Sequence, residues 1–252
     1  MRATRKRPSG EGNANGALEK YRRKRRFGVT PEPRGTAAKR RRPKALAYVV
    51  QKHRATALHH DFRLEWDGVM KSWAVPKGPS LDPSAKRLAM PTEDHPIEYN
   101  AFEGVIPEGE YGGGTVMIWD RGTWIPEVPD VDEALRRGEL KFRLEGEKLK
   151  GSWVLVRIGK SDEKKKPWLL IKHKDAAASR RSITDDQPRS VASGRLLVEI
   201  ARDEGGDMAR AADGDPPALL RRMLENPKLV KPPRRAHRKS VWHSDRPGPR
   251  VS

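Results

Sequence analysis

The chain of 252 residues contains no cysteine, no long apolar run and few acidic residues relative to basic ones. The absence of cysteine excludes disulfides, thiolate nucleophiles and zinc sites built on thiolates. No apolar stretch approaches the ~20 residues that a membrane-spanning helix requires. The first 16 residues lack the apolar core of a signal peptide. We therefore expect a soluble protein of the cytoplasm.

The charge balance points to a polyanionic partner. Lys and Arg number 53 against 34 Asp and Glu, a net charge of +19, and residues 1–45 alone hold 16 basic residues against 3 Glu. Such a surplus favours binding to nucleic acid. An anionic membrane surface is the weaker alternative, because no apolar helical face accompanies the basic runs. A basic arm of this kind also matches a simple solubilising tail.

Composition divides the chain into three parts. Residues 1–44 are rich in Arg, Lys, Gly and Pro, with the densest basic run at 39–44, and we expect a largely flexible arm with a short helical stretch near 18–26. Residues 45–175 hold six of the seven tryptophans and form the predicted packed domain. Residues 176–252 are polar and basic and predict an extension with short elements near 193–201 and 218–224.

The packed domain is predicted to be mainly β. Alternating or apolar runs separated by Gly and Pro turns are typical of a compact antiparallel barrel or sandwich, and we expect a barrel with short helices between flexible basic tails. The expected strands are 46–51, 59–65, 69–75, 115–120, 139–144, 151–157 and 168–172. A short helix is expected at 131–137. Asp67-Gly68 indicates a tight hairpin after the second strand.

The most informative stretch lies between His53 and Arg63. In a strand, period-two geometry places His59, Asp61 and Arg63 on one face and His60 on the other. The imidazoles of His53 and His59 could then converge with the carboxylate of Asp61. Such a trio can hold a divalent transition metal and leave positions open for substrate. Arg63 is placed to bind a phosphate bidentately. This grouping favours metal-assisted chemistry at phosphorus.

Other interpretations of the same residues remain. A solvated sheet face with salt bridges also gathers such side chains, and two histidines with one carboxylate are also the ligand set of non-haem iron oxygenases. The glycine-rich run 109–114 lacks the Gly-Lys-Ser/Thr ending and the strand-to-helix context of a nucleotide-binding loop, so we reject that function for it. We expect a loop that lets the substrate backbone pass close by.

Four further residues are candidates for phosphate binding. Lys77 lies in the rigid turn Pro-Lys-Gly-Pro (76–79), and Arg87 lies in a polar segment. Each is equally well explained as a cation on the protein surface with no role in binding. His95 lies between acidic neighbours and a proline, a poor setting for a core residue. It can donate a proton or a hydrogen bond to a phosphoryl oxygen. Tyr99 can do the same, although a tyrosine that caps a barrel end is the commoner case.

Several long motifs resemble a known family, the 3′-phosphoesterase domain of bacterial DNA ligase D. The similarity runs from about residue 18 to about residue 201. The motifs are QKH (51–53), LHHDFRLE (58–65), WAVPKGPS (73–80), EDHP (93–96), FEGVIPEGEYGGG (102–114), LKGSW (149–153) and WLLIK (168–172).

The resemblance implies a compact barrel that trims DNA 3′ ends with manganese or another divalent transition metal. A phosphodiesterase step removes a terminal ribonucleoside, and a phosphomonoesterase step then leaves a 3′-hydroxyl for end joining. Its implied site residues are the metal ligands His53, His59 and Asp61; Arg63, His95 and Tyr99 around the scissile phosphate; the further cations Lys77 and Arg87; and Arg25 and Glu32 in the arm.

Two positions depart from the family pattern. Arg26 stands where the family usually has an acidic residue, which puts the arm's contribution in doubt. His60 stands where the family usually has tyrosine, on the strand face opposite the predicted ligands. Because neither a ligase nor a polymerase domain fits in the remaining length, we expect a stand-alone version acting at DNA 3′ ends near the nucleoid, with a separate DNA ligase and Ku-type end-joining proteins.

Two alternative functions remain. The chain could be a catalytically silent DNA-binding or scaffold subunit of an end-joining complex. It could instead be a phosphoesterase for RNA ends or 2′,3′-cyclic phosphates.

Overall fold

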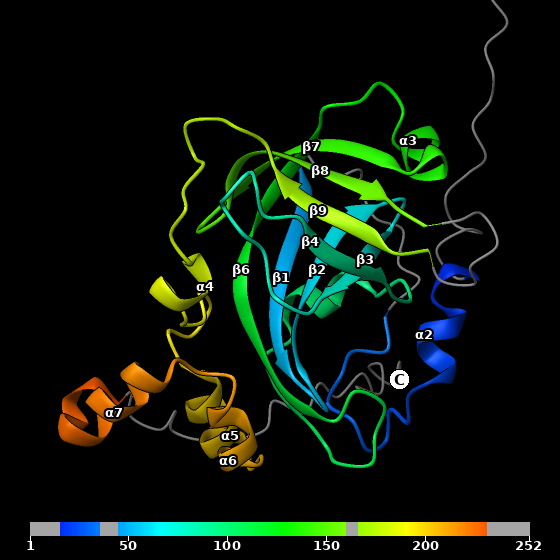
Figure 1. The fold of residues 1–252 in the computed structure, drawn as a ribbon. Helices are drawn as coiled ribbons and strands as arrows, with labels where there is room; N and C mark the ends of the chain where they lie inside the picture. Colours follow the sequence, from blue (N-terminus) through cyan, green and yellow to red (C-terminus); the bar gives the residue numbers. More distant parts are fainter. Residues whose placement is uncertain (1–15, 36–44, 160–165, 231–252) are drawn as a thin grey trace, which may run out of the picture.

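A computed structural model describes residues 16–35, 45–159 and 166–230. Eight strands form a closed antiparallel barrel in the order β1-β2-β3-β4-β9-β8-β7-β6, with β6 pairing back onto β1, and β5 is added beside β6 (Figure 1). The predicted mainly β barrel is therefore confirmed. The strands are β1 (Leu46–Arg54), β2 (Leu58–Trp66), β3 (Val69–Val75), β4 (Arg87–Pro91), β5 (Gly104–Ile106), β6 (Gly114–Pro126), β7 (Glu139–Gly146), β8 (Lys150–Arg157) and β9 (Trp168–Lys172).

All seven predicted strands are present, and β4 and β5 were missed. β4 pairs through only two residues with β3 and three with β9. β5 is three residues long. Strands this short do not show enough alternation to be distinguished from loops. The predicted hairpin is confirmed, since Asp67 and Gly68 both have positive φ, as a two-residue primed turn requires.

The barrel interior is filled by side chains. Alternate residues of β2, Phe62 and Leu64, point inward and join a buried cluster that includes Trp119, Trp124 and Trp153. Barrels of eight strands have interiors just wide enough for side chains. Because side chains alternate along a strand, His59, Asp61 and Arg63 of β2 lie on the outer face of the barrel wall.

The helices are short and flank the barrel. They are α2 (Glu19–Arg23), η1 (Ile97–Ala101), α3 (Val131–Arg137), α4 (Ile183–Asp186), α5 (Leu197–Glu204), α6 (Met208–Ala212), α7 (Pro217–Glu225) and η2 (Pro227–Leu229). The predicted helix 131–137 is confirmed at both ends, because the Asp130 side chain caps its N-terminus and Gly138 ends it in the left-handed conformation. None of the described helices has the length and apolar character that a membrane-spanning segment requires.

Part of the predicted flexible arm packs on the barrel. The Tyr21 side chain of α2 is fully buried with Tyr99, Phe102 and Val116. These contacts bury apolar surface, which holds the segment in place. The same holds beyond residue 175, where Leu197 of α5 joins the barrel's interior cluster. The basic run 39–44 lies outside the described residues.

Candidate functional site

The predicted metal ligands come together on the outer face of β1 and β2. His53 is the direct cross-strand partner of His59, and Asp61 follows two residues later on the same face. One oxygen of the Asp61 carboxylate lies 3.6 Å from His53 Nδ1 and 3.7 Å from His59 Nε2. One ligand atom from each of the three residues lies within 4.8 Å of the other two. Antiparallel pairing thus brings the His53, His59 and Asp61 trio close enough together that one cation could contact all three residues.

Backbone carbonyls orient both imidazoles. His53 Nε2 lies 2.8 Å from the carbonyl oxygen of Gly112, and His59 Nδ1 lies 3.0 Å from that of Ala57. Each ring therefore donates its outer N–H to a carbonyl and turns its other nitrogen toward Asp61. Metal-binding histidines are oriented in this way. Gly112 has a φ of 80°, a left-handed conformation that favours glycine. In this conformation the carbonyl of Gly112 contacts His53, so the glycine-rich run helps to orient this imidazole.

The ionisation states of the trio suit a cation. Burial alone would raise the pKa of Asp61, but the Arg63 guanidinium beside it holds this pKa well below its usual range. Burial lowers the pKa of His59. Asp61 therefore presents a carboxylate and His59 a neutral imidazole, the forms that ligate a metal. Two nitrogens and one oxygen fit a divalent transition metal.

Arg63 lies beside the trio and is almost completely buried. Its Nη2 is 3.1 Å from the Asp61 carboxylate, and its Nε donates to Gln51 Oε1 at 2.9 Å. Gln51 in turn donates to the carbonyls of Tyr99 and Phe102. This bracing role of Gln51 was missed by the sequence interpretation, although it lies two residues before His53 on the same strand face. Arg63 is therefore a fixed cation beside the trio.

His95 sits between two arginines. Its Nδ1 lies 2.9 Å from Arg63 Nη1 and 2.8 Å from the carbonyl oxygen of Glu93, and its Nε2 lies 3.3 Å from Arg25 Nη2. Burial, followed by the charges of Arg63 and Arg25, lowers the pKa of His95 well below its ordinary value. The imidazole is therefore neutral beside two cations, and an arriving anion would favour its protonation.

Tyr99 completes this part of the site. Its ring packs edge-on against His95 and Tyr21, and the guanidinium of Arg63 lies 5.0 Å from its centroid. Burial raises the pKa of Tyr99 well above its ordinary value. The hydroxyl therefore keeps its proton and can act as a hydrogen-bond donor.

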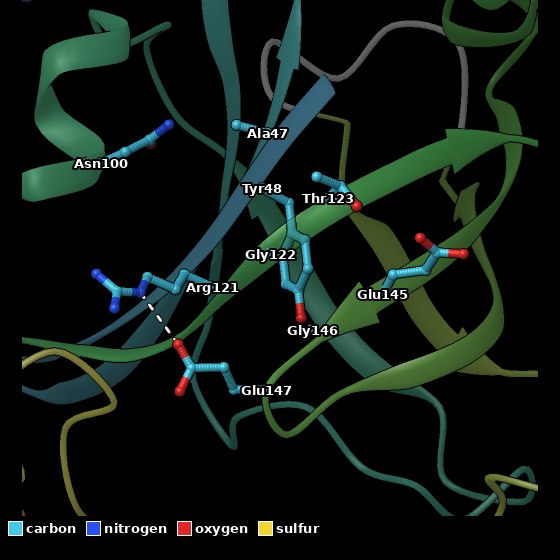
Figure 2. A pocket seen from close by; sticks show the side chains of 9 residues that line it. All are labelled: Ala47, Tyr48, Asn100, Arg121, Gly122, Thr123, Glu145, Gly146 and Glu147. Carbon is cyan, nitrogen blue, oxygen red and sulfur yellow. Dashed lines mark hydrogen bonds and ion pairs between the residues drawn. The ribbon is translucent and has the colours of Figure 1, made fainter. Parts of the chain in front are cut away.

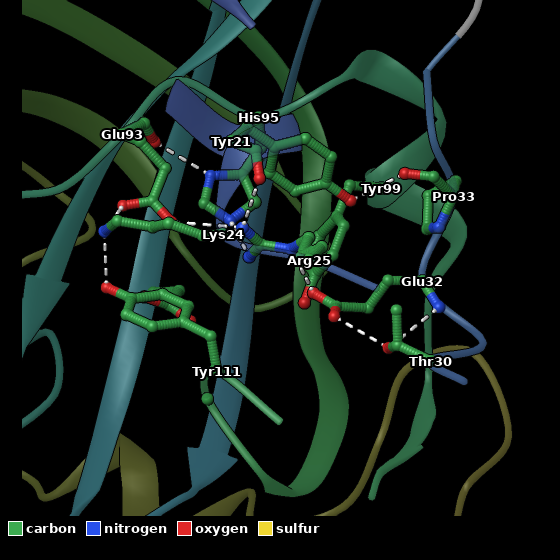
Figure 3. Close-up of polar contacts among 12 residues, drawn as sticks. Tyr21, Lys24, Arg25, Thr30, Glu32, Pro33, Glu93, His95, Tyr99 and Tyr111 are labelled. Atoms are coloured by element: carbon green, nitrogen blue, oxygen red, sulfur yellow. Dashed lines mark hydrogen bonds and ion pairs between the residues drawn. The ribbon is translucent and has the colours of Figure 1, made fainter. Parts of the chain in front are cut away.

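The arm contributes charged residues directly to the site (Figure 3). Arg25 lies over the Tyr21 ring, pairs with Glu32 at 2.8 Å and contacts Glu93 at 3.2 Å. Lys24 pairs with the same Glu93 at 2.9 Å. The structure thus brings the predicted Arg25 beside His95, and the predicted Glu32 holds Arg25 through their ion pair. Lys24 and Glu93 were missed as site residues; the acidic residues flanking His95 were the available signal.

Arg26 is neutralised where it departs from the family pattern. Its guanidinium is exposed and pairs with the buried carboxylate of Glu110 in the glycine-rich run. This pair joins the arm to the loop that orients His53. The basic side chain at this position is therefore compatible with a folded arm.

Lys77 and Arg87 are not joined to the rest of the predicted site. Lys77 is exposed in the turn after β3, and Arg87 begins β4. In the described part of the chain, neither makes a hydrogen bond or ion pair with the trio, and Arg87 Nε is buried without a partner. Their role in catalysis stays a prediction.

A separate hollow lies on another part of the barrel. It has a volume of about 490 Å³ and includes Tyr48, Asn100 and Thr123, with the Arg121–Glu147 ion pair at one edge (Figure 2). None of the predicted site residues lines it. The candidate site is therefore defined by its charged side chains rather than by this hollow.

Comparison with known proteins shows that the barrel region resembles a class of phosphoesterase domains. Residues 51–157 match the sequence model described as DNA Ligase D 3′-phosphoesterase domain. The chain is 48% identical over 198 residues to the multifunctional non-homologous end joining protein LigD of Pseudomonas aeruginosa, covering 77% of this chain and 23% of that protein. It is 47% identical over 140 residues to the multifunctional non-homologous end joining DNA repair protein LigD of Mycobacterium tuberculosis, covering 56% of this chain and 18% of that protein.

The matched segment contains all three residues of the trio together with His95 and Tyr99. The chain spans about a quarter or less of the length of these relatives. Residues 51–157 belong to the family of DNA ligase D 3′-phosphoesterase domains.

Proposed function

We propose that the protein is a divalent-metal-dependent phosphoesterase that processes DNA 3′ ends for end joining, with manganese as its metal. The observation that carries this is the convergence of His53, His59 and Asp61 beside the buried Arg63. The family match and the LigD relatives, whose names state end joining, support the same assignment. DNA ends are the proposed substrate, and the net charge of +19 suits them.

The proposed reaction has two hydrolytic steps. Water first adds to the phosphorus of the terminal linkage, the bond to the 5′-oxygen of the last ribonucleoside breaks, and a 3′-phosphate remains. Water then cleaves the 3′-phosphate to a 3′-hydroxyl and inorganic phosphate. The metal, when bound by the trio, supplies Lewis-acid polarisation of a phosphoryl oxygen.

The chain's own side chains position the phosphate and move the proton. Arg63 is held by Asp61 and Gln51 with its fork already oriented, so it can bind two phosphoryl oxygens with little reorganisation. His95 is the donor to the leaving oxygen, because a bound phosphate would offset the two arginines that now keep it neutral. Tyr99 donates a hydrogen bond to a further oxygen.

Other proposed contributions come from the arm and from two isolated cations. Arg25, held by Glu32, places a second guanidinium next to His95. Lys77 and Arg87 would contact the substrate at the periphery of the site. We further propose that the protein acts in the cytoplasm at the nucleoid, together with a separate DNA ligase and Ku-type end-joining proteins.

A panel of labelled oligonucleotides tests the substrate class. The panel holds a DNA primer with a 3′-phosphate, an all-RNA strand with a 3′-phosphate and a strand with a 2′,3′-cyclic phosphate, each with manganese. Preference for the DNA primer supports the proposal, whereas preference for either RNA substrate overturns the DNA assignment. DNA binding without turnover on any substrate, equal in wild type and His59→Ala, would favour the scaffold alternative.

A further inference from the structure

The turn between β1 and β2 determines how one metal ligand is held. Residues 55–57 form this turn, and Thr56 and Ala57 are exposed. The carbonyl of Ala57 accepts the hydrogen bond from His59 Nδ1 at 3.0 Å. The direction in which His59 Nε2 points therefore depends on how firmly this short turn is fixed.

Two guanidinium groups hold the turn. Arg54 Nη1 donates to the carbonyls of Ala55 and Thr56, each at 3.0 Å. Arg210, on α6, donates through Nε to the same Ala55 carbonyl at 2.9 Å. Hydrogen bonds from a charged donor are stronger than neutral ones. The turn is thus fixed from one side by its own strand and from the other by a helix distant in the sequence.

Residues just after α6 strengthen this contact. Asp213 accepts from Arg54 Nη2 at 3.2 Å. At Gly214, a Cβ atom would lie 3.2 Å from the Leu58 side chain and 2.5 Å from that of Leu197. A larger residue here would have to displace the ends of both leucine side chains. The segment from Arg210 to Gly214 therefore packs around both the turn and the start of the strand that carries His59.

We propose that Arg210 is a positioning residue for the metal ligand His59. Through the 55–57 turn it would keep the Nδ1–H tautomer of His59 bonded to Ala57, leaving Nε2 available to a divalent cation. α6 lies outside residues 51–157, which match the phosphoesterase family. A helix of the C-terminal extension would therefore influence the metal affinity of the His53, His59 and Asp61 trio. The inference rests on the proposed metal-binding function.

The test compares three variants of the full chain. Arg210→Met removes the donor and keeps the apolar stem, Arg210→Lys restores a cationic donor, and Arg222→Met removes an exposed arginine from α7 as the matched control. Calorimetric titration with Mn²⁺ gives the affinity, and long-range ¹H–¹⁵N spectra of the metal-free protein give the tautomer of His59.

We expect Arg210→Met to weaken Mn²⁺ binding about tenfold, at the lower end of the effect of outer-shell partners, and to reduce the population of the Nδ1–H tautomer. Arg210→Lys should recover part of both, and Arg222→Met should change neither. An Arg210→Met variant that matches the control in both measurements overturns the inference. If Arg210→Met does not fold, Arg210→Gln takes its place, because its shorter side chain does not reproduce the bond to the Ala55 carbonyl. Wild-type affinity and wild-type tautomer in Arg210→Gln would then overturn the inference.

The two proposals fail in different ways. If wild type binds no Mn²⁺ and cleaves no substrate, the proposed function fails, while the tautomer spectra still report whether Arg210 orients His59. If wild type binds Mn²⁺ and Arg210→Met has no effect, the proposed function stands and the positioning role fails.

Discussion

Replacing His60 with phenylalanine should make the protein less sensitive to acid. His60 faces the barrel interior, as the strand alternation predicted, and packs edge-on against Trp119. Neither of its ring nitrogens has a hydrogen-bond partner within the described residues. Burial, followed by the charge of Lys52, lowers the pKa of His60 to about 3 from 6.5. Folding therefore requires this imidazole to stay neutral.

The sign and size of the effect follow from proton linkage. Because the folded pKa lies below the unfolded one, the unfolded chain binds more protons between these two values, and stability falls as pH drops through 6.5 toward 3. The slope from one such group approaches roughly 1.4 kcal/mol per pH unit. From about pH 8 to about pH 5, His60 alone should cost the fold about 2 kcal/mol.

Urea unfolding of wild type and His60→Phe at several pH values measures this difference. We expect the free energy of unfolding of His60→Phe, relative to that of wild type, to rise by about 2 kcal/mol as the pH falls from about 8 to about 5. His173→Phe, at a half-exposed histidine, controls for the loss of an imidazole. Parallel pH profiles for wild type and His60→Phe would refute the argument that a buried neutral His60 limits acid stability.

Three further outcomes are expected. Asp61→Asn should lower the free energy of unfolding by about 3 kcal/mol, because it leaves the buried Arg63 without an anionic partner. Asp94→Asn, in the half-exposed pair with Lys71, is the control. An Asp61→Asn variant as stable as wild type in urea unfolding would contradict this. Activity should fall as the pH drops below the ordinary range of histidine, because burial lowers the pKa of His59 and only the neutral ring ligates a metal. A profile that stays flat over the whole acidic range in which the protein is folded would argue against His59 as a ligand. Neutralising the basic residues of 39–42 should weaken the salt dependence of DNA binding. The slope of log affinity against log salt concentration should become shallower by up to about 0.9 for each DNA phosphate that these residues neutralise. An unchanged slope would exclude this run from the interface.

The salt experiment uses substitution rather than deletion of the whole arm for a structural reason. Tyr21 and Arg25 lie inside the candidate site, so removing residues 1–44 would damage the site as well as the basic run. Point substitutions separate electrostatic attraction from the architecture of the site.

Local patterns predicted the part of the site that lies within one strand. Alternation alone placed His59, Asp61 and Arg63 on one face and His60 on the other, because side chains alternate strictly along a strand. His53 was expected to join this group, but its exact place opposite His59 comes from the pairing of β1 with β2, which no local pattern contains. The helix at 131–137 was predictable because its cap residues stand next to it in sequence.

Contacts between distant segments were not predictable. A basic composition near the N-terminus indicated flexibility, yet a few apolar residues around Tyr21 are enough to pack the segment against η1 and β6. The bracing of Arg63 by Gln51 and the contact of Arg210 with the 55–57 turn likewise depend on tertiary packing. Such contacts join residues whose sequence neighbours carry no sign of the partner.

The central claim is tested most directly by a 5′-labelled primer-template that ends in one ribonucleotide, incubated with manganese and either wild type or His59→Ala. The proposed function predicts stepwise conversion to a 3′-phosphate and then to a 3′-hydroxyl by wild type, with neither product from the variant or in the presence of chelator. Wild type that binds this DNA but leaves it intact with every divalent metal would contradict the claim.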